Sequence, residues 1–340
     1  MINEVWFVVL ASMLTGYAVL DGFDLGVGAL HLFVARTREE RKMTIEAIGP
    51  VWNGNEVWLL AAGGSMVVAF PHLYASAFSG FYLALMIVLW LLVLRGLGIE
   101  FRHQLQDPLW EHAWDVSFAA SSALLSLVFG VALGNVLRGV PFDANGEFQG
   151  SFALLLNPFA LACGLLAVAV LLAHGGAYLA LKTTGPVAER ARRAVGATWW
   201  AVATLLAVVT AASFLVHPDF TSNFASQPAL MLLPAAAAAS LAAVAVFNSR
   251  RMERRTFQAT SALIVFVLAS VAAGLFPQLL PAISGSQHEG LDIYNAASPP
   301  RSLWIALGIY LVGLALVTIY LTRIYIIWGG KVRPGASYDA

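Results

Sequence analysis

The sequence predicts an all-α polytopic membrane protein with nine transmembrane helices. Of its 340 residues, 59% are hydrophobic and only 11% are charged, whereas a soluble domain carries about 25% charged residues. Apolar runs of eighteen residues or more recur along the chain, and runs of that length are typical of membrane spans. The basic residues alternate with these runs in a way that supports nine spans, because an even number would break the alternation.

The nine predicted spans are joined by short connections and form a single integral membrane domain. They cover residues 5–35, 51–70, 75–97, 116–137, 158–181, 196–216, 229–247, 257–280 and 303–328. Eight of them can be grouped as two bundles of four, over residues 1–140 and 157–282, which leaves a peripheral helix at 303–330. The two longest connections, 138–157 and 281–302, are rich in Gly, Pro, Asn and Ser, as loops are.

The distribution of positive charge predicts the orientation. Of the 19 Lys and Arg residues, all but Arg138 and Arg301 fall on one side of the predicted membrane. These residues are Arg36, Arg38, Arg41, Lys42, Arg95, Arg102, Lys182, Arg190, Arg192, Arg193, Arg250, Arg251, Arg254, Arg255, Arg323, Lys331 and Arg333. Because cytoplasmic loops carry an excess of Lys and Arg, we expect the N-terminus outside and the C-terminus in the cytoplasm.

Two carboxylates lie inside the first span. Asp21 and Asp24 are three residues apart, so they share a helix face. A carboxylate at the centre of a span costs about 2.5–3.5 kcal/mol on insertion scales, and such residues are usually functional. The glycines around them allow a neighbouring helix to approach closely. The orientation places both aspartates in the cytoplasmic half of the membrane.

The next two spans bring further polar groups to the same depth. Asn53 and Glu56 share a face at the cytoplasmic start of the second span, and Arg95 and Glu100 lie near the end of the third. One arginine among several acids can keep some carboxylates charged while others bind protons. The sequence therefore predicts a path for protons or ions. The alternative is that Arg95 only neutralises an acid and the cluster holds the helices together.

Other classes of site are not indicated. The net charge is zero, which gives no sign of nucleic-acid binding, and the single cysteine, Cys163, excludes an internal disulfide or a cysteine metal site. The first span lacks the features of a cleaved signal peptide, so we expect it in the mature protein. His174 is the one histidine well inside a span, and we interpret it as a hydrogen-bonded packing residue. We expect no catalytic residue, metal site or haem in this chain alone.

Several motifs together are similar to one family of membrane proteins. They are Asp21-Gly-Phe-Asp24-Leu-Gly-Val-Gly28, Pro50-Val-Trp52-Asn53-Gly54-Asn55-Glu56-Val-Trp58, Ala77-Phe-Ser-Gly-Phe-Tyr82, Arg95 with Gly98-Ile-Glu100-Phe-Arg102, Gly130-Val-Ala-Leu-Gly134-Asn135, Gly139-Val-Pro141-Phe142 and Leu156-Asn157-Pro158-Phe159. The sequence resembles subunit II of the cytochrome bd-type quinol oxidases over nearly its whole length.

The resemblance implies a function in a complex. Enzymes of this family oxidise membrane quinol, reduce oxygen to water and take up cytoplasmic protons, which generates a proton motive force across the bacterial cytoplasmic membrane. Their fold is two four-helix bundles plus one peripheral helix. Subunit I carries the haems (b and d-type, or b-type only) and the quinol site, and it pairs with subunit II. Some members have small single-helix accessory subunits, and in some subunit II holds a structural quinone.

The resemblance also implies roles for individual residues. The residues that match Asp21, Asp24 and Arg95 line a proton path toward the haems, and the tryptophan that matches Trp58 lies near an oxygen access route. Many members have an acid where this chain has Asn53, which cannot titrate. The final step of the path therefore uses either a water chain past Asn53 or Glu56, one turn further on. The outer connection 217–228 is short for the family, which weakens the case for a quinone there.

Two other functions compete with that of an oxidase subunit. A stand-alone secondary transporter could use the same acids for proton coupling, since transporters contain broken helices and inverted repeats near the midplane. Here the acidic, glycine-rich segment has no second copy in the later half of the chain. A purely structural scaffold would leave the buried acids without a role.

Overall fold

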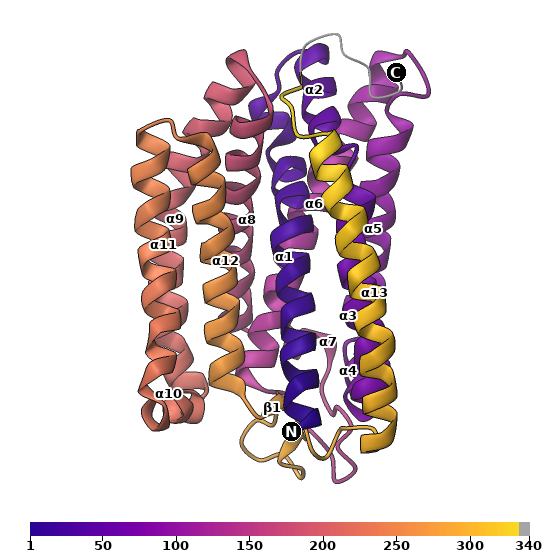
Figure 1. The fold of residues 1–340 in the computed structure, drawn as a ribbon, viewed down its shortest axis with the longest axis vertical. Coiled ribbons are helices and arrows are strands. Elements are labelled where there is room, and N and C mark those ends of the chain that lie inside the picture. The colour runs from indigo at the N-terminus through magenta and orange to yellow at the C-terminus, as the bar shows by residue number, and fades with distance from the viewer. Residues whose placement is uncertain (333–340) are drawn as a thin grey trace.

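The protein is described here by a computed structural model covering residues 1–332, and its long elements are all helices (Figure 1). The helices are α1 (Ile2–Val34), α2 (Arg38–Ile48), α3 (Trp52–Ala69), α4 (Pro71–Gly80), α5 (Tyr82–Phe101), α6 (Pro108–Arg138), α7 (Phe152–Leu155), α8 (Pro158–Lys182), α9 (Gly185–Val216), α10 (Ser222–Ser226), α11 (Leu232–Ser249), α12 (Glu253–Leu275) and α13 (Pro300–Ile327). Two short 3₁₀ helices, η1 (Pro218–Thr221) and η2 (Pro228–Met231), flank α10. The strands β1 (Gln278–Pro281) and β2 (Gly290–Asp292) pair antiparallel, with Leu280 opposite Leu291.

The prediction of an all-α polytopic membrane protein is confirmed. Within residues 1–332, 8 helices are long and apolar enough to cross a membrane. The predicted second span, 51–70, forms α3, which is not one of the eight. Its first turns carry Asn53, Asn55 and Glu56, and these polar side chains lower the hydropathy of an otherwise apolar helix. The polar residues predicted for the proton path are thus among those that lower the hydropathy of this segment below that of the eight spans.

Helix boundaries differ from the predicted spans where charged or aromatic residues intervene. The segment predicted as the third span is divided at Phe81 into α4 and α5. Helix α6 begins eight residues before the predicted fourth span, because the Asp107 side chain caps it by accepting from the backbone N–H groups of Leu109 and Trp110. Helix α9 begins at Gly185 and not at 196. Both extensions are charged, so hydropathy does not detect them.

Helix α1 occupies the centre of the molecule. In Figure 1 it lies between α8, α9, α11 and α12 on one side and α3, α5, α6 and α13 on the other. Helices α1 and α8 touch backbone to backbone, since a Cβ added to Gly26 would overlap the main chain of Leu171 and Gly175. Close helix contact of this kind requires glycine. As a result, every residue from Asp21 to His31 is buried.

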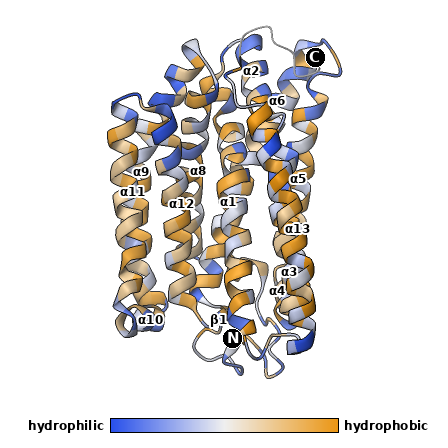
Figure 2. Ribbon diagram, viewed as in Figure 1, coloured by the Kyte–Doolittle hydropathy of each residue, from blue (hydrophilic) through white to orange (hydrophobic). Residues whose placement is uncertain are grey.

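The two ends of the helix bundle differ in charge. Figure 2 shows hydrophilic residues at both ends and an apolar band between them. We call the end that carries α2 the α2 end. The helix ends and connections there contain most of the basic residues, whereas Arg138 and Arg301 lie at the ends of α6 and α13 on the opposite side. Arg333 lies outside the described residues.

Candidate functional site

The core of the site is an ion pair between α1 and α5. Arg95 donates through Nη1 to Asp21 Oδ2 at 2.7 Å and through Nη2 to Asp21 Oδ1. Both side chains are fully buried. The pair is bidentate, which is the strongest arrangement for arginine and a carboxylate. Arg95 Nη1 also lies 3.6 Å from Oε1 of Glu56 on α3, so the guanidinium joins three helices.

Asp24 lies beside this ion pair but has a different set of contacts. Its Oδ2 accepts a hydrogen bond from Asn55 Nδ2 at 2.7 Å, and the hydroxyl of Tyr325 donates to Asn55 Oδ1 at 3.0 Å. Its other oxygen, Oδ1, is buried and has no hydrogen-bond partner within residues 1–332. An unpaired carboxylate oxygen in a buried site favours binding a proton or a water molecule. Asp24 is therefore the carboxylate of this site best suited to exchange a proton.

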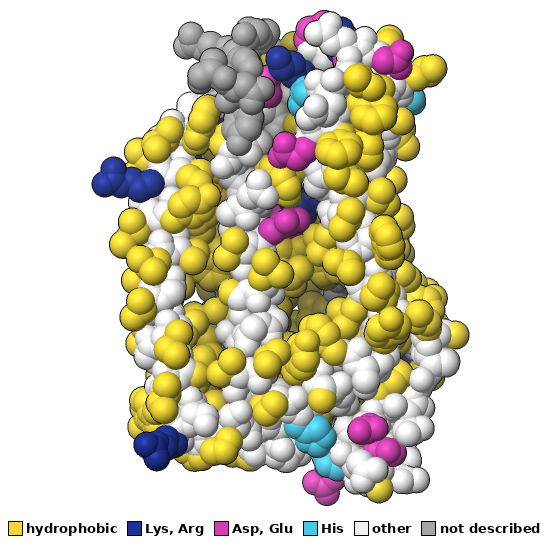
Figure 3. Space-filling view, turned by 90° about the vertical axis from the view of Figure 1, so that its right-hand side faces the viewer, with side chains coloured by type: hydrophobic (Ala, Val, Ile, Leu, Met, Phe, Trp, Pro, Cys, Tyr) yellow, Lys and Arg dark blue, Asp and Glu magenta, His cyan; other side chains and the backbone are white. Residues whose placement is uncertain are grey.

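The remaining predicted residues lie further out. Asn53 and Glu100 are exposed, and the side chain of Glu56 is 26% exposed. Figure 3 shows acidic side chains on the face formed by the right-hand side of Figure 1, where hydrophobic side chains surround them. Of the six residues predicted for the path, Asp21, Asp24 and Glu56 lie around Arg95, and of these three only Glu56 is partly exposed. Within residues 1–332 Glu100 forms no ion pair with them, and Asn53 is exposed at the start of α3.

Trp58 lies on the α13 side of the site. Its ring packs on Gly16, where a Cβ would lie 2.8 Å from the ring, and its Nε1 is buried without a hydrogen-bond partner in the described part of the chain. An open, largely apolar cavity of about 390 Å³ adjoins it between α1, α3 and α13. Its lining residues are Leu20, Trp58, Thr318, Leu321, Thr322, Tyr325 and Ile326.

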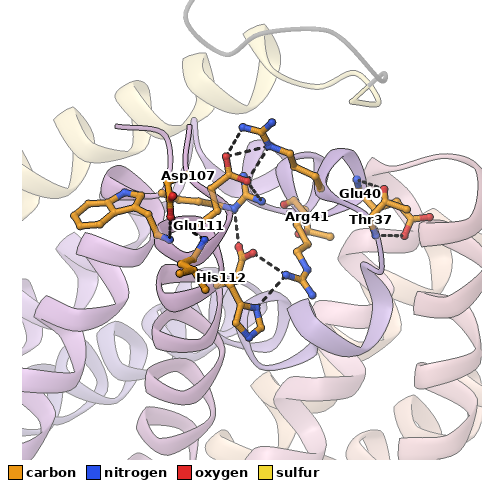
Figure 4. Close-up of polar contacts among 12 residues, drawn as sticks. Thr37, Glu40, Arg41, Asp107, Glu111 and His112 are labelled. Carbon is orange, nitrogen blue, oxygen red and sulfur yellow. Dashed lines mark hydrogen bonds and ion pairs between the residues drawn. The ribbon is translucent and has the colours of Figure 1, made fainter. Parts of the chain in front are cut away.

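A second polar cluster, which the sequence analysis did not identify, lies toward the α2 end. Its centre is Asp115 on α6, which accepts from Arg102 Nε at 2.6 Å and from Arg41 Nη1 at 3.1 Å. His31 Nε2 lies 2.8 Å from the same carboxylate. Figure 4 shows Arg41, Glu111 and His112 converging between α2 and α6. We call His31, Thr44, Arg102 and Asp115 the His31 cluster.

Helix α2 is held firmly over this cluster. Thr37 and Glu40 form a reciprocal capping box at its start. Burial acts to raise the pKa of Glu40, but hydrogen bonds from the backbone N–H of Arg36 and from the Arg190 side chain lower it overall. Glu40 therefore stays charged and ties α2 to α9. Arg38 binds Glu111 on α6 through two nitrogens, so α2 is fixed to both neighbours.

The contacts of His174 are those of a hydrogen-bonded packing residue. Its Nδ1 lies 2.8 Å from Thr260 Oγ1 and its Nε2 lies 2.9 Å from the carbonyl oxygen of Val19. The ring stacks on Phe257 with 5.0 Å between centroids. Within residues 1–332 there is also no group of three or more His, Cys, Asp or Glu side chains arranged to hold a metal ion. The carboxylates around Arg95 are groups that can bind and release protons.

Comparison with known proteins gives a consistent result. A family described as "Cytochrome bd terminal oxidase subunit II" matches residues 2–328. The chain is 34% identical to a probable cytochrome oxidase subunit 2 of Haemophilus influenzae, over 95% of this chain and 92% of that one. It is 29% identical to subunit 2 of the cytochrome bd-I ubiquinol oxidase of Escherichia coli K12, over 94% and 92% of the two chains.

The fold is also found among solved structures. A chain of the bd oxidase from Geobacillus thermodenitrificans superposes with a TM-score of 0.78. The match covers 96% of this chain and 98% of that chain at 17% sequence identity.

Proposed function

The chain belongs to the cytochrome bd terminal oxidase subunit II family, and from this we propose that it supplies protons to a quinol-oxidising terminal oxidase of the bacterial cytoplasmic membrane. In this proposal the chain itself carries no redox centre. A partner subunit I holds the haems, oxidises quinol and reduces oxygen to water. The protons for that reduction come from the cytoplasm, and their uptake generates a proton motive force. A structural quinone and small accessory subunits are predictions from the family resemblance.

The observation that carries the proposal is the buried carboxylate of Asp24 with its unpaired oxygen. It lies next to the Asp21–Arg95 ion pair. The ion pair supplies a fixed arrangement of charge, and Asp24 can take up and release a proton beside it. Glu56 connects this interior to the outer face, because its carboxylate lies 3.6 Å from Arg95 and its side chain is 26% exposed. We propose the order Asp24, Asp21–Arg95, Glu56, and then the partner.

The exposed face of Figure 3 is the proposed contact with subunit I. A carboxylate on an apolar protein surface at the depth of the lipid tails is costly unless another protein covers it. Glu100 and Asn53 lie on the exposed parts of α5 and α3, where they would meet the partner. Trp58 and the cavity beside it are the proposed access route for oxygen. In this arrangement nine helices cross the membrane, α3 included, with the α2 end in the cytoplasm.

We also propose the division into bundles that the sequence predicts. Residues 1–140 form the first bundle with the polar cluster, 157–282 form the second, and 303–330 form the peripheral helix. The grouping of α8, α9, α11 and α12 on one side of α1 in Figure 1 supports it. So does the exposure of α13, of which only two residues, Leu303 and Leu321, are buried.

Purification distinguishes this function from that of a stand-alone proton-coupled transporter. If the proposal holds, the chain extracted in mild detergent copurifies with a haem-bearing subunit. The preparation then shows haem absorbance and quinol-driven oxygen uptake. A stable, colourless protein that moves protons on its own in vesicles would contradict the proposal and favour the transporter.

Replacement of Glu56 tests the last step of the path. We expect Glu56→Gln to slow oxygen uptake by about tenfold or more, because removing a positioned proton-transfer group costs at least that much in most enzymes. Asn53→Ala is the matched comparison on the same helix, and we expect it to have little effect. If Glu56→Gln is silent and Asn53→Ala is slow, the proton passes by water at Asn53 and not through Glu56.

A further inference from the structure

His31 is a buried histidine with both ring nitrogens engaged. It lies on α1, in the same helix as Asp21 and Asp24, and its side chain is fully buried. Its Nδ1 lies 2.6 Å from Thr44 Oγ1, and its Nε2 lies 2.8 Å from Asp115 Oδ1. The Phe118 ring packs edge-on against the imidazole at 5.4 Å. The contacts of each nitrogen decide how many protons the ring carries.

The hydrogen bonds of His31 are compatible with a charged and with a neutral ring. Asp115 already accepts from Arg102 and Arg41, so it is a carboxylate and can only accept. His31 Nε2 must therefore donate. When the Thr44 hydroxyl donates its one hydrogen to the carbonyl of Arg41 at 2.8 Å, its oxygen accepts from Nδ1. When it turns toward the ring, it donates to Nδ1. A neutral imidazole has a single N–H, so the first arrangement belongs to the imidazolium and the second to the neutral ring with its proton on Nε2.

The surroundings of this imidazolium favour release of a proton. The titratable and charged groups that are joined to it by a chain of direct contacts are Arg38 and Arg41 of α2, Arg102 after α5, and Glu111, His112 and Asp115 of α6. These groups include three arginines and two carboxylates, so their summed charge is positive even when His31 is neutral. A further positive charge is then held only weakly. When the ring loses the Nδ1 proton, the Thr44 hydroxyl can turn to donate to Nδ1.

One face of α1 runs from His31 to Asp24, with the hydroxyl of Ser122 of α6 against it. Asp24, Gly28 and His31 lie on one face of α1, because their spacings are four and three residues. The rise between Asp24 and His31 is about 10 Å at 1.5 Å per residue. The hydroxyl of Ser122, two turns along α6 from Asp115, lies against Gly28, where a Cβ would overlap it. Ser122 Oγ is buried with no hydrogen-bond partner in residues 1–332.

We propose that His31 is the proton carrier between the cytoplasm and Asp24. This inference rests on the proposed function and extends its path toward the α2 end. The Nδ1–H bond of the imidazolium breaks, and an O–H bond forms at Oδ1 of Asp24, which becomes a neutral acid. Water bound to the Ser122 hydroxyl carries the proton between them, because a buried hydroxyl without a protein partner is a place where water binds. A proton from the cytoplasm then restores the imidazolium.

The test uses the whole oxidase complex and a set of matched variants. His31→Gln keeps hydrogen-bonding capacity but cannot carry a charge, and His72→Gln makes the same change at a half-buried histidine of α4, at the opposite end of the molecule from α2. Ser122→Ala removes the intermediate hydroxyl with little change of volume. Asp24→Asn is measured in parallel. Oxygen uptake is followed between about pH 5 and 8, the range in which histidine changes its charge, together with haem content.

We expect His31→Gln to lose about tenfold in turnover and to flatten the pH profile, with haem content unchanged. Ser122→Ala should also slow turnover, and His72→Gln should match the wild type. In His31→Ala, added imidazole should restore part of the rate, which a structural role would not explain. A wild-type rate and pH profile in both His31→Gln and Ser122→Ala would overturn the inference.

The outcomes separate this inference from the proposed function. If Asp24→Asn is slow while the His31 and Ser122 variants are normal, only the carrier role of His31 is wrong. If all three are normal, the proposed proton path itself is contradicted. A loss of haem or of turnover in His31→Gln that imidazole does not restore in His31→Ala, with the pH profile unchanged, would assign His31 a structural role and overturn the inference.

Discussion

Asp24→Asn is expected to reduce quinol-driven oxygen uptake by about a hundredfold, the lower part of the usual range for loss of an acid–base group. The amide can still bond to Asn55, so the packing among α1, α3 and α13 is retained. What it cannot do is bind and release a proton at the position of Oδ1. Haem content and subunit association should therefore stay at the wild-type level, as measured by the redox spectrum of the purified complex.

Asp219→Asn is the control for this experiment. It makes the same chemical change at an exposed aspartate in η1, at the opposite end of the molecule from α2. We expect it to leave turnover unchanged. Wild-type turnover in Asp24→Asn would remove Asp24 from the path, and loss of haem in that variant would assign it a role in assembly.

Arg95→Met is expected to have the largest effect on stability. It leaves the fully buried carboxylate of Asp21 without its bidentate partner. Removing one partner of a buried ion pair costs about 3–5 kcal/mol, because the remaining charge is uncompensated. We expect a clear fall in the thermal unfolding temperature of the complex and in its yield. Arg254→Met, at an exposed position on α12, should have little effect.

A double variant identifies the cause of that loss. In Asp21→Asn/Arg95→Met neither buried charge is left, so most of the stability should return, as it does when buried ion pairs are replaced as a whole. The double variant should still be slow in oxygen uptake, because the fixed charges beside Asp24 are gone. If it is as unstable as Arg95→Met alone, packing and not the orphaned charge of Asp21 accounts for the loss.

Much of the helical fold could be predicted from the sequence because lipid-facing helices must be apolar along their length. Hydropathy located α8 and α13 closely, since no charged residue interrupts them until their ends. It missed the first turns of α6 and α9, which are charged, and it did not detect the break at Phe81. The β1–β2 hairpin was also missed, because its residues were assigned to the end of the eighth span and to a loop.

The interior of the site could be predicted only in part. Asp21, Asp24, Glu56 and Arg95 stand out because charge inside an apolar run is costly. Asn55 and Tyr325 do not stand out, although their side chains meet across 270 residues of sequence. Asp115 is similarly inconspicuous, since it lies in a charged segment that resembles a loop. Its contact with His31 spans 84 residues, and only the packing of α6 on α1 brings the two together.

The placement of Glu100 shows the limit of depth as a criterion. Its place in the sequence predicts the same membrane depth as that of the other acids. In the structure, however, its side chain is exposed. Residues Arg95 and Glu100 are five apart on a helix, and this spacing places them on different faces. A membrane depth can be predicted from the sequence, whereas the direction of a side chain depends on which neighbours the helix packs against.

The central claim is that protons for oxygen reduction pass through Asp24 of this chain. It is tested most directly by following proton uptake with a pH indicator as oxygen is mixed with the reduced complex, with its α2 end facing the indicator. The account predicts that uptake in Asp24→Asn is slowed by the same factor as oxygen reduction, while Asp219→Asn takes up protons at the wild-type rate. Proton uptake at the wild-type rate in Asp24→Asn would contradict it.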